Sequence, residues 1–236
     1  MIIWLIPLLI AAYLIGSIPA AQIAARLYRG IDLRQHGTGQ VGGGNLWRLT
    51  SWRLGFPVGV FDFTKGLGMV WVANLAGLDI APQILVGSAV IIGHNWSVFL
   101  RFSGGRGLGT TIGVVSILPI INEMTPWATV SFLTILVVGS AVMRSSPVAA
   151  LASAAALPIV SWLYQEPIPV VLSFLVIFLI IVIKRLTAPL SPEGVTLRKR
   201  ELMLNRFLFD RDISDRRLWM YRNLPSGGKE EGSLNK

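Results

Sequence analysis

The chain has 236 residues, of which 53% are hydrophobic and 14% are charged, and its net charge is +9. A soluble domain typically has about 25% charged residues, so this composition excludes an ordinary soluble domain and indicates a polytopic membrane protein. In such a protein a positive balance reflects basic cytoplasmic loops, and we therefore expect no nucleic-acid partner. The chain has no cysteine, which excludes disulfides and cysteine metal sites.

Long apolar stretches predict an all-α protein with about seven transmembrane helices, since about 20 apolar residues span a bilayer. The predicted spans are about 3–25, 54–77, 81–101, 107–121, 126–143, 147–164 and 167–184. We interpret the first as a retained helix, because it is long and has no basic start. Gly16–Pro19 near its inner end predicts a kink with close helix approach.

The charges between these spans alternate in sign. The first, third and fifth connections are basic, whereas the second, fourth and sixth carry only Asp79, Glu123 and Glu166. The positive-inside rule then predicts an N-terminus outside and a cytoplasmic C-terminus for this multi-pass protein. Both glycine-rich loops described below would face the cytoplasm.

The last part of the chain differs in composition. We divide the chain into a transmembrane domain, 1–185, and a cytoplasmic basic tail, 186–236. The apolar spacing in 202–208 is consistent with an amphipathic helix on the inner leaflet, or equally with a solvated basic tail. The composition of 227–236 predicts disorder.

The first basic connection contains a glycine-rich stretch, DLRQHGTGQVGGGNLWR, from Asp32 to Arg48. Glycine lets the backbone approach a ligand closely, and free N–H groups in such a loop can bind an anion. We predict catalytic roles for Thr38, Asn45 and Arg48. The predicted substrate-binding residues of this loop are Arg34, Gly39, Gly42, Gly43 and Gly44.

A second stretch, SGGRGLGT from Ser103 to Thr110, repeats this chemistry. Its Arg106 is a predicted catalytic residue, and Gly104, Gly105 and Gly107 are predicted to bind substrate. We interpret the two loops as halves of one phosphate-handling site on one membrane face. The alternative is a pair of flexible interfacial loops whose arginines simply follow the positive-inside rule.

Ionisable groups also lie inside the predicted spans. Asp62 and Lys65 are three residues apart, on one helix face, and His94 interrupts the third span. Such groups are functional candidates by default, and we assign Lys65 and His94 to the catalytic set. A packing ion pair and a satisfied structural histidine are the alternatives.

The sequence offers no Ser-His-Asp or Cys-His arrangement and no metal-ligand spacing. We therefore expect no metal and no cofactor, and an enzyme here would act through positioning and electrostatic stabilisation.

In order along the chain, these motifs resemble those of the bacterial acyl-phosphate-dependent glycerol-3-phosphate acyltransferases. The family pattern runs GSIP, DLR-x-x-GSGN-x-GATN-x-x-R, D-x-x-KG and GH-x-x-P-x-FLxF-x-GGKG. The matching stretches are Gly16–Pro19, Asp32–Arg48, Asp62–Gly66 and Gly93–Gly107. The resemblance implies an enzyme of phospholipid biosynthesis with seven helices, located in the cell (plasma or inner) membrane. It moves a fatty acyl chain from acyl phosphate to the 1-hydroxyl of glycerol 3-phosphate, giving lysophosphatidic acid.

The resemblance also suggests roles and partners. Loop N–H groups, Asn45 and Arg106 would hold the donor phosphate, and Arg48 and Lys65 would clamp the acceptor phosphate. The acyl chain would lie between helices, in membrane lipid. The expected partners are glycerol 3-phosphate, acyl phosphate and lipid, and we expect a monomer.

The chain departs from the family pattern at seven positions, one of which is Gly43 in place of alanine. Thr38 replaces serine, Gln40 asparagine, Gly44 threonine, Ser97 proline and Arg106 lysine. In the tail motif the family's histidine is Leu202, whereas Asn205, a predicted substrate-binding residue, and Arg206 match its second half. Two alternatives therefore stay open: a transporter of a phosphorylated solute, and a non-catalytic lipid-binding paralogue.

Overall fold

The computed structural model describes residues 2–220, and the regular structure in these residues is helical. The helices are α1 (Leu5–Ser17), α2 (Ala20–Arg29), α3 (Gly43–Leu49), α4 (Trp52–Leu75), α5 (Ile80–Asn95), α6 (Leu108–Ile121), α7 (Trp127–Val142), α8 (Ser146–Leu163), α9 (Ile168–Leu186), α10 (Lys199–Phe209) and α11 (Arg216–Met220). Short 3-10 turns lie at Ile2–Trp4, Leu33–Gln35, Val98–Leu100 and Glu193–Thr196. The all-α prediction is confirmed, while the predicted disorder of 227–236 lies outside the described residues.

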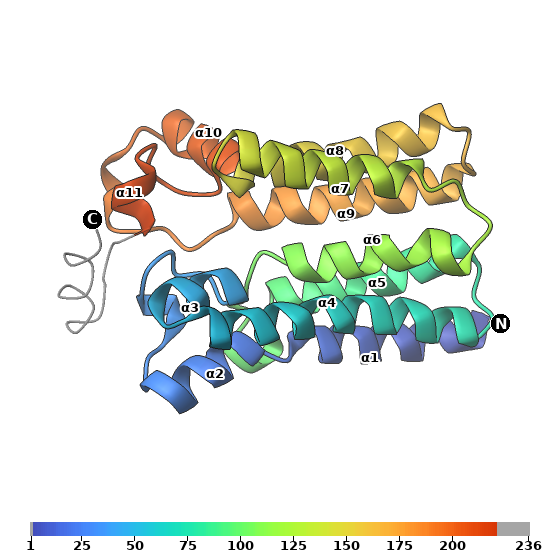
Figure 1. The fold of residues 1–236 in the computed structure, drawn as a ribbon, viewed down its shortest axis with the longest axis horizontal. Coiled ribbons are helices and arrows are strands. Elements are labelled where there is room, and N and C mark those ends of the chain that lie inside the picture. The colour runs from blue at the N-terminus through green and yellow to red at the C-terminus, as the bar shows by residue number, and fades with distance from the viewer. Residues whose placement is uncertain (1, 221–236) are drawn as a thin grey trace.

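The long helices run side by side in two groups, α7–α9 and α1, α4, α5 and α6 (Figure 1). The groups meet in a core of buried apolar side chains. Five of its fully buried members are Ile84, Leu118, Phe132, Leu157 and Phe174, one from each of α5–α9. The core therefore ties the two groups together along their length.

A helix lies at each predicted span, but these helices differ in length and polarity. Four stretches of the described residues are long and apolar enough to cross a membrane: Leu5–Arg29, Ile80–Leu100, Ser146–Leu163 and Ile168–Leu186. α6 and α7 are apolar but have only 14 and 16 residues. α4 has 24 residues but contains Asp62 and Lys65. The number of seven crossings stays a prediction.

The first predicted span is broken into α1 and α2 at Ile18 and Pro19. Proline cannot continue the helical hydrogen-bond pattern, so carbonyls in the last turn of α1 need other donors. The Gly16 carbonyl accepts from Lys65 Nζ at 3.0 Å, and the Ser17 carbonyl accepts from Ser97 Oγ at 2.5 Å. The break thus supplies acceptors to side chains of two other segments.

Glycines bring two pairs of helices into backbone contact. Where α1 meets α5, a Cβ added at Gly16 or Gly93 would lie 2.2 Å from a backbone oxygen of the other helix. Where α4 meets α6, a Cβ at Gly66 would lie 2.3 Å, and one at Gly113 2.0 Å, from such an oxygen. Only a residue without a side chain fits at these distances.

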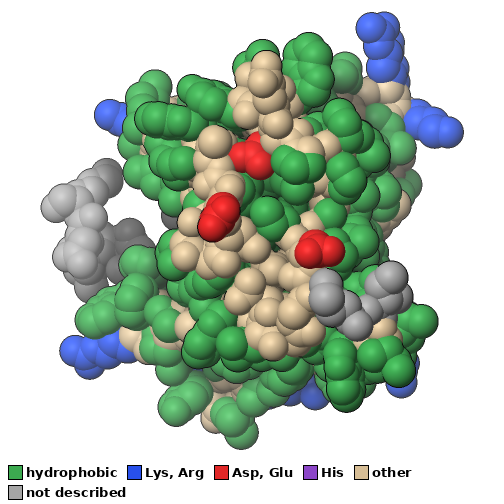
Figure 2. Space-filling view, turned by 90° about the vertical axis from the view of Figure 1, so that its right-hand side faces the viewer, with side chains coloured by type: hydrophobic (Ala, Val, Ile, Leu, Met, Phe, Trp, Pro, Cys, Tyr) green, Lys and Arg blue, Asp and Glu red, His purple; other side chains and the backbone are tan. Residues whose placement is uncertain are grey.

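The two ends of the bundle carry opposite charges. The connections that hold Asp79, Glu123 and Glu166 lie together at one end, on the right in Figure 1. Figure 2 shows this end, with acidic groups on its face and Lys and Arg only at its margins. The glycine-rich loops and the tail lie at the other end. The connections that alternate between basic and acidic along the chain therefore lie at opposite ends of the bundle.

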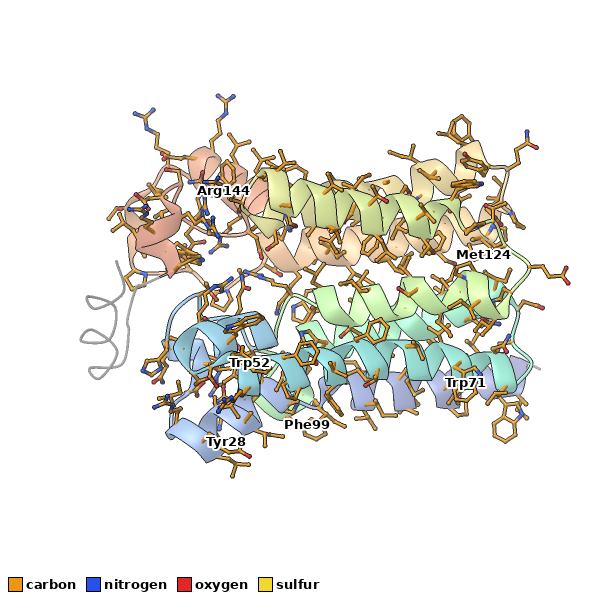
Figure 3. All side chains as sticks on the ribbon, in the orientation of Figure 1. Tyr28, Trp52, Trp71, Phe99, Met124 and Arg144 are labelled. Atoms are coloured by element: carbon orange, nitrogen blue, oxygen red, sulfur yellow. The ribbon has the colours of Figure 1, made fainter. Side chains whose placement is uncertain are left out.

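Large apolar side chains cover much of the outer surface between the two ends. Aromatic residues stand near both ends: Trp71 at the acidic end and Tyr28 and Trp52 at the basic end, all more than one third exposed (Figure 3). Aromatic side chains at the limits of an apolar band are typical of membrane interfaces.

We expect cysteines introduced at Ser214 and Glu123 to react with an impermeant thiol reagent from opposite sides of the membrane. Both positions are exposed, at the basic and the acidic end, and the natural chain has no cysteine to interfere. Position 214 should react from the cytoplasmic side only. Labelling of both from one side would contradict the predicted orientation.

The Gly113→Ala variant should unfold more readily, by roughly 1–3 kcal/mol, because its methyl group would press on the backbone of α4. Gly68→Ala is the matched control, since a Cβ there meets nothing within 4 Å. It should be neutral or slightly stabilising. Thermal unfolding in detergent measures both, and equal midpoints would argue against the close α4–α6 contact.

Candidate active site

A cavity of about 580 Å³ lies at the basic end of the bundle. Its walls come from the first glycine-rich loop and α3, α4, the second loop with the start of α6, the start of α8, the end of α9, and the tail around α11. One side is apolar, with Phe56, Val60 and Phe63 of α4. The cavity therefore combines loops rich in N–H groups with an apolar helix face.

A second cavity of about 390 Å³ lies beside the first. Cationic side chains in its lining are Arg34, Arg106, Lys184, Arg206 and Arg211. Thr38, Gln40 and Arg106 line both cavities and so stand between them. An anionic group would be favoured on either side of this boundary.

The structure brings the two glycine-rich loops together, as the shared-site prediction requires. The first cavity is lined by the predicted residues Thr38, Gly42, Gly43, Gly44, Asn45, Arg48, His94, Gly105, Arg106 and Gly107. The second is lined by the predicted residues Arg34, Thr38, Gly39, Gly104 and Arg106. Lys65 and Asn205 line neither cavity.

Asn45 organises the first loop from within. Its Oδ1 accepts from the Thr38 N–H at 3.1 Å, while its Nδ2 donates to the carbonyls of His36 and Gln40, both at 3.1 Å. The side chain is 3% exposed. These bonds occupy both ends of the amide, which differs from the expectation that Asn45 itself holds a phosphate. It shapes the loop that would do so.

Lys65 lies behind the cavity wall. Its Nζ is 2.8 Å from Asp62 Oδ1, 3.0 Å from the Gly16 carbonyl and 3.0 Å from His94 Nδ1. An ammonium has three N–H groups, so these contacts leave it none for a substrate. The predicted clamp on the acceptor phosphate does not fit this geometry. Lys65 instead joins α4 to the end of α1 and to His94.

His94 links this buried group to the cavity. Its Nδ1 lies 3.3 Å from Asp62 Oδ1, and its backbone carbonyl accepts from the Gly105 N–H at 3.1 Å. A Cβ at Gly105 would lie 2.2 Å from His94 Nε2, so the second loop can rest on the imidazole only with glycine there. Asp62 and Lys65 therefore hold a side chain that supports the second loop.

Arg106 is held by two protein groups. Its Nε lies 3.0 Å from Asp210 Oδ1, and its Nη1 donates to the Lys184 carbonyl at 2.8 Å. Asp210 follows α10 and also accepts from Gln40 Nε2 at 3.2 Å. The predicted donor-phosphate cation thus already has a carboxylate beside it, contributed by the tail.

Asn205 belongs to the framework of the tail. Its Nδ2 donates to the Asp212 carbonyl at 3.0 Å. The Asp212 carboxylate accepts from Arg206 Nε at 2.6 Å and from the Ser191 N–H at 2.7 Å. Burial raises the pKa of Asp212, but these hydrogen bonds outweigh it and hold the pKa below its ordinary value. Asn205 therefore helps to hold the tail in its docked position. Its contact with substrate stays a prediction.

Arg34 is engaged with its near neighbour Asp32. Its Nε donates to Oδ1 at 2.9 Å and its Nη2 to Oδ2 at 2.5 Å. The Arg34 hydrogen bonds hold the pKa of the Asp32 carboxyl below its ordinary value. A phosphate at Arg34 would therefore have to share it with Asp32.

Several lining residues were not predicted from the sequence. They are Gln40, Arg185, Asp210, Arg211 and Trp219. Arg185, in the last turn of α9, donates to the Phe207 carbonyl at 2.8 Å and the Pro147 carbonyl at 2.5 Å, which joins three helical segments. Arg185 could have been predicted because it is a cation at the end of a predicted span. Nothing in the sequence near Asp210 indicates that it lines a cavity.

We expect Asp212→Asn to loosen the tail at pH 7, by about 1.5–3 kcal/mol, since it removes charged hydrogen-bond acceptors from a buried site. In the natural chain the pKa of Asp212 is lowered by folding, so this carboxylate stabilises tail docking fully above the ordinary pKa of 3.8. The stabilisation is lost as the pH falls through the lowered pKa. Hydrogen exchange of residues 199–212, corrected for intrinsic rates, measures both effects. Glu201→Gln, an exposed change on α10, is the control. Equal exchange in the two variants would contradict the anchoring role.

Comparison with known proteins gives consistent matches. The family model for glycerol-3-phosphate acyltransferase matches residues 6–188. Glycerol-3-phosphate acyltransferase 4 of Dehalococcoides mccartyi (strain CBDB1) is 38% identical over 219 residues, covering 90% of this chain and 91% of the relative. The enzyme of Desulforudis audaxviator (strain MP104C) is 38% identical over 142 residues, covering 58% of this chain and 70% of the relative.

The fold is similar to that of a solved membrane protein. The crystal structure of PlsY (YgiH), an integral membrane glycerol 3-phosphate acyltransferase, in its glycerol 3-phosphate form has a TM-score of 0.69 and 26% identity, covering 86% of this chain and 94% of PlsY. The resemblance noted from the ordered motifs is confirmed by these matches. The chain belongs to the glycerol-3-phosphate acyltransferase family.

Proposed function

We propose that this membrane protein transfers a fatty acyl group from an acyl phosphate to the 1-hydroxyl of glycerol 3-phosphate. The products are lysophosphatidic acid and inorganic phosphate. Family membership supports this activity, as does the likeness to PlsY, which has been solved in a glycerol 3-phosphate form and a lysophosphatidic acid form. The observation that carries it is one cavity walled by two glycine-rich loops, by cations and by an apolar helix face.

The lining of the first cavity suits the donor. Its acyl chain would lie against Phe56, Val60 and Phe63, which continue into the apolar outer surface of α4. Its phosphate would lie near Arg106 and the start of α6, where Leu108 and Gly109 line the cavity. The first N–H groups of a helix have no helical partner and attract negative charge. They would stabilise the charge that grows on the leaving phosphate.

The reaction needs no strong protein base. The glycerol 3-phosphate hydroxyl oxygen bonds to the acyl carbon, and the bond from that carbon to the phosphate oxygen breaks. A phosphate oxygen takes the hydroxyl proton. Because the donor is already activated, holding the two substrates together and stabilising the leaving charge are the main tasks of the protein.

Arg48 is the proposed cation for the acceptor phosphate. It is exposed, lines the first cavity and follows the glycine-rich loop directly on α3. Thr38, on the boundary between the cavities, would contact the reacting phosphates through its hydroxyl, because its N–H already donates to Asn45. Asp62, Lys65, His94 and Asn45 act behind these groups by fixing the loops.

The remaining features of the proposal concern placement in the cell. The basic end faces the cytoplasm of a bacterial inner membrane, where glycerol 3-phosphate is available, and the protein crosses the membrane seven times. It acts as a monomer, since both cavities are built by one chain. The segment after residue 185 completes the site and is no separate catalytic unit, because Asp210 and Trp219 line the cavities.

Purified protein should convert labelled glycerol 3-phosphate and palmitoyl phosphate into a labelled lipid, measured after lipid extraction. Protein-dependent uptake of the label into vesicles without lipid product would support the transporter alternative. If the protein gives no lipid product and no uptake of the label, the result would support the non-catalytic paralogue.

Arg48→Ala should lower kcat/KM by a factor of roughly 30 to 1,000, the equivalent of about 2–4 kcal/mol for one charge-assisted phosphate contact. Arg48→Lys should recover only part of this loss, because an ammonium cannot form the bidentate fork. Arg29→Ala, at the exposed end of α2, is a control that removes a cation outside both cavities. A folded Arg48→Ala protein with near-normal kcat/KM would rule out the role.

A further inference from the structure

Two departures from the family pattern meet at a single tail residue. Gln40 stands where the family has asparagine, and Arg106 stands where it has lysine. Gln40 Nε2 donates to Asp210 Oδ2 at 3.2 Å, and Arg106 Nε lies 3.0 Å from Asp210 Oδ1. The Asp210 carboxylate therefore has a hydrogen bond from the first glycine-rich loop at Oδ2 and an ion pair with the second at Oδ1, where the geometry is not that of a hydrogen bond.

We propose that Asp210 is a positioning residue that fixes the Arg106 guanidinium for the donor phosphate. This inference rests on the proposed acyltransferase function and adds a residue to it. Asp210 lies outside the segment matched by the family model, 6–188, and is separated from Gln40 by 170 positions in the sequence.

The carboxylate is presented by a rigid part of the tail. Asp210 ends α10 in the left-handed region, with φ 55° and ψ 38°, and its N–H donates to the Arg206 carbonyl at 3.1 Å. Two residues on, buried Asp212 is bonded to Arg206 and Ser191. This anchoring argues for a fixed wall of the cavity and against a flap that must leave before substrate binds.

The contacts leave one face of the arginine for an anion. Nε is beside Asp210, and Nη1 donates to the Lys184 carbonyl at 2.8 Å. Among residues 2–220, no hydrogen-bond partner contacts Nη2, and Arg106 lines both cavities. Nη2 is thus the nitrogen that the donor phosphate would meet. The ion pair at Nε and the hydrogen bond at Nη1 restrict the guanidinium, which lowers the conformational freedom lost when that contact forms.

The three side chains work as one set. A lysine at position 106 has a single terminal nitrogen and cannot offer a planar fork with separate directions to Asp210, to Lys184 and to a phosphate. Asparagine at position 40 would be one methylene shorter, which withdraws the second donor from the Asp210 carboxylate. Glutamine at position 40 and arginine at position 106 are therefore the residues that suit a carboxylate at position 210.

The first test separates positioning from simple charge attraction. In Asp210→Asn, Arg106 keeps its charge and loses its counter-charge. We expect kcat to fall about tenfold, while KM for palmitoyl phosphate stays unchanged or decreases. The control is Glu201→Gln, which removes an exposed acidic charge from the same tail helix and should match the natural chain. Thermal unfolding of both variants should equal that of the natural chain.

The second test exchanges donor and acceptor across the contact. Gln40→Glu alone sets two carboxylates against each other and should lower kcat at least tenfold. Combined with Asp210→Asn, the new asparagine amide can donate to the new carboxylate, and the double variant should be more active than Gln40→Glu alone. Strictly multiplicative losses in this cycle would overturn the contact's role.

The outcomes separate the two proposals. Asp210→Asn with the kcat of Glu201→Gln, in active protein, would overturn the positioning role and leave the acyltransferase function standing. A rise in kcat in Asp210→Asn would also overturn it and would mark the carboxylate as an internal competitor of the substrate. If neither the natural chain nor Glu201→Gln makes lipid, the acyltransferase function fails, and the positioning role fails with it.

Discussion

The cavity depends on the contacts that the buried Lys65 ammonium makes with Asp62, Gly16 and His94. A charge removed from water is tolerated only with close partners, and this one has the Asp62 carboxylate, the Gly16 carbonyl and the His94 ring within 3.0 Å. Each partner comes from a different helix, so satisfying one charge fixes the end of α1, the middle of α4 and the end of α5 relative to one another. The helix break at Ile18 and Pro19 makes this arrangement possible, because in an unbroken helix the Gly16 carbonyl would accept a hydrogen bond from within the helix.

The framework reaches the cavity through hydrogen bonds and glycine contacts. Asn45 binds three backbone groups of the first loop, and His94 supports the second loop at Gly105. The tail closes the remaining side through Asp212 and Arg185. Asn45, Asp212 and Arg185 thus serve to hold backbone of the loops and the tail in place.

The sequence predicted the helices and the two loops well, because apolar length, glycine content and charge sign are local properties. It could not resolve the roles of Asn45 and Lys65, since a buried polar residue that organises a loop and one that binds a ligand carry the same signal. Asp210 was missed because its partners lie 104 and 170 positions away. Likewise, the crossing count depends on lengths such as that of α6, which composition alone left open.

The shortness of α7 has a consequence for the surrounding lipid. Its 16 residues extend about 24 Å, whereas the hydrocarbon layer of a bilayer is about 30 Å thick. Val130, Val137 and Val142 are exposed on it, so acyl tails would meet this helix directly in the predicted crossing. Such hydrophobic mismatch is relieved by local thinning of the bilayer. In the predicted crossing, thinning would draw headgroups beside α7 toward Ser145–Pro147, where the cavity begins, and would shorten the path of a lipid-borne substrate from the leaflet to the loops.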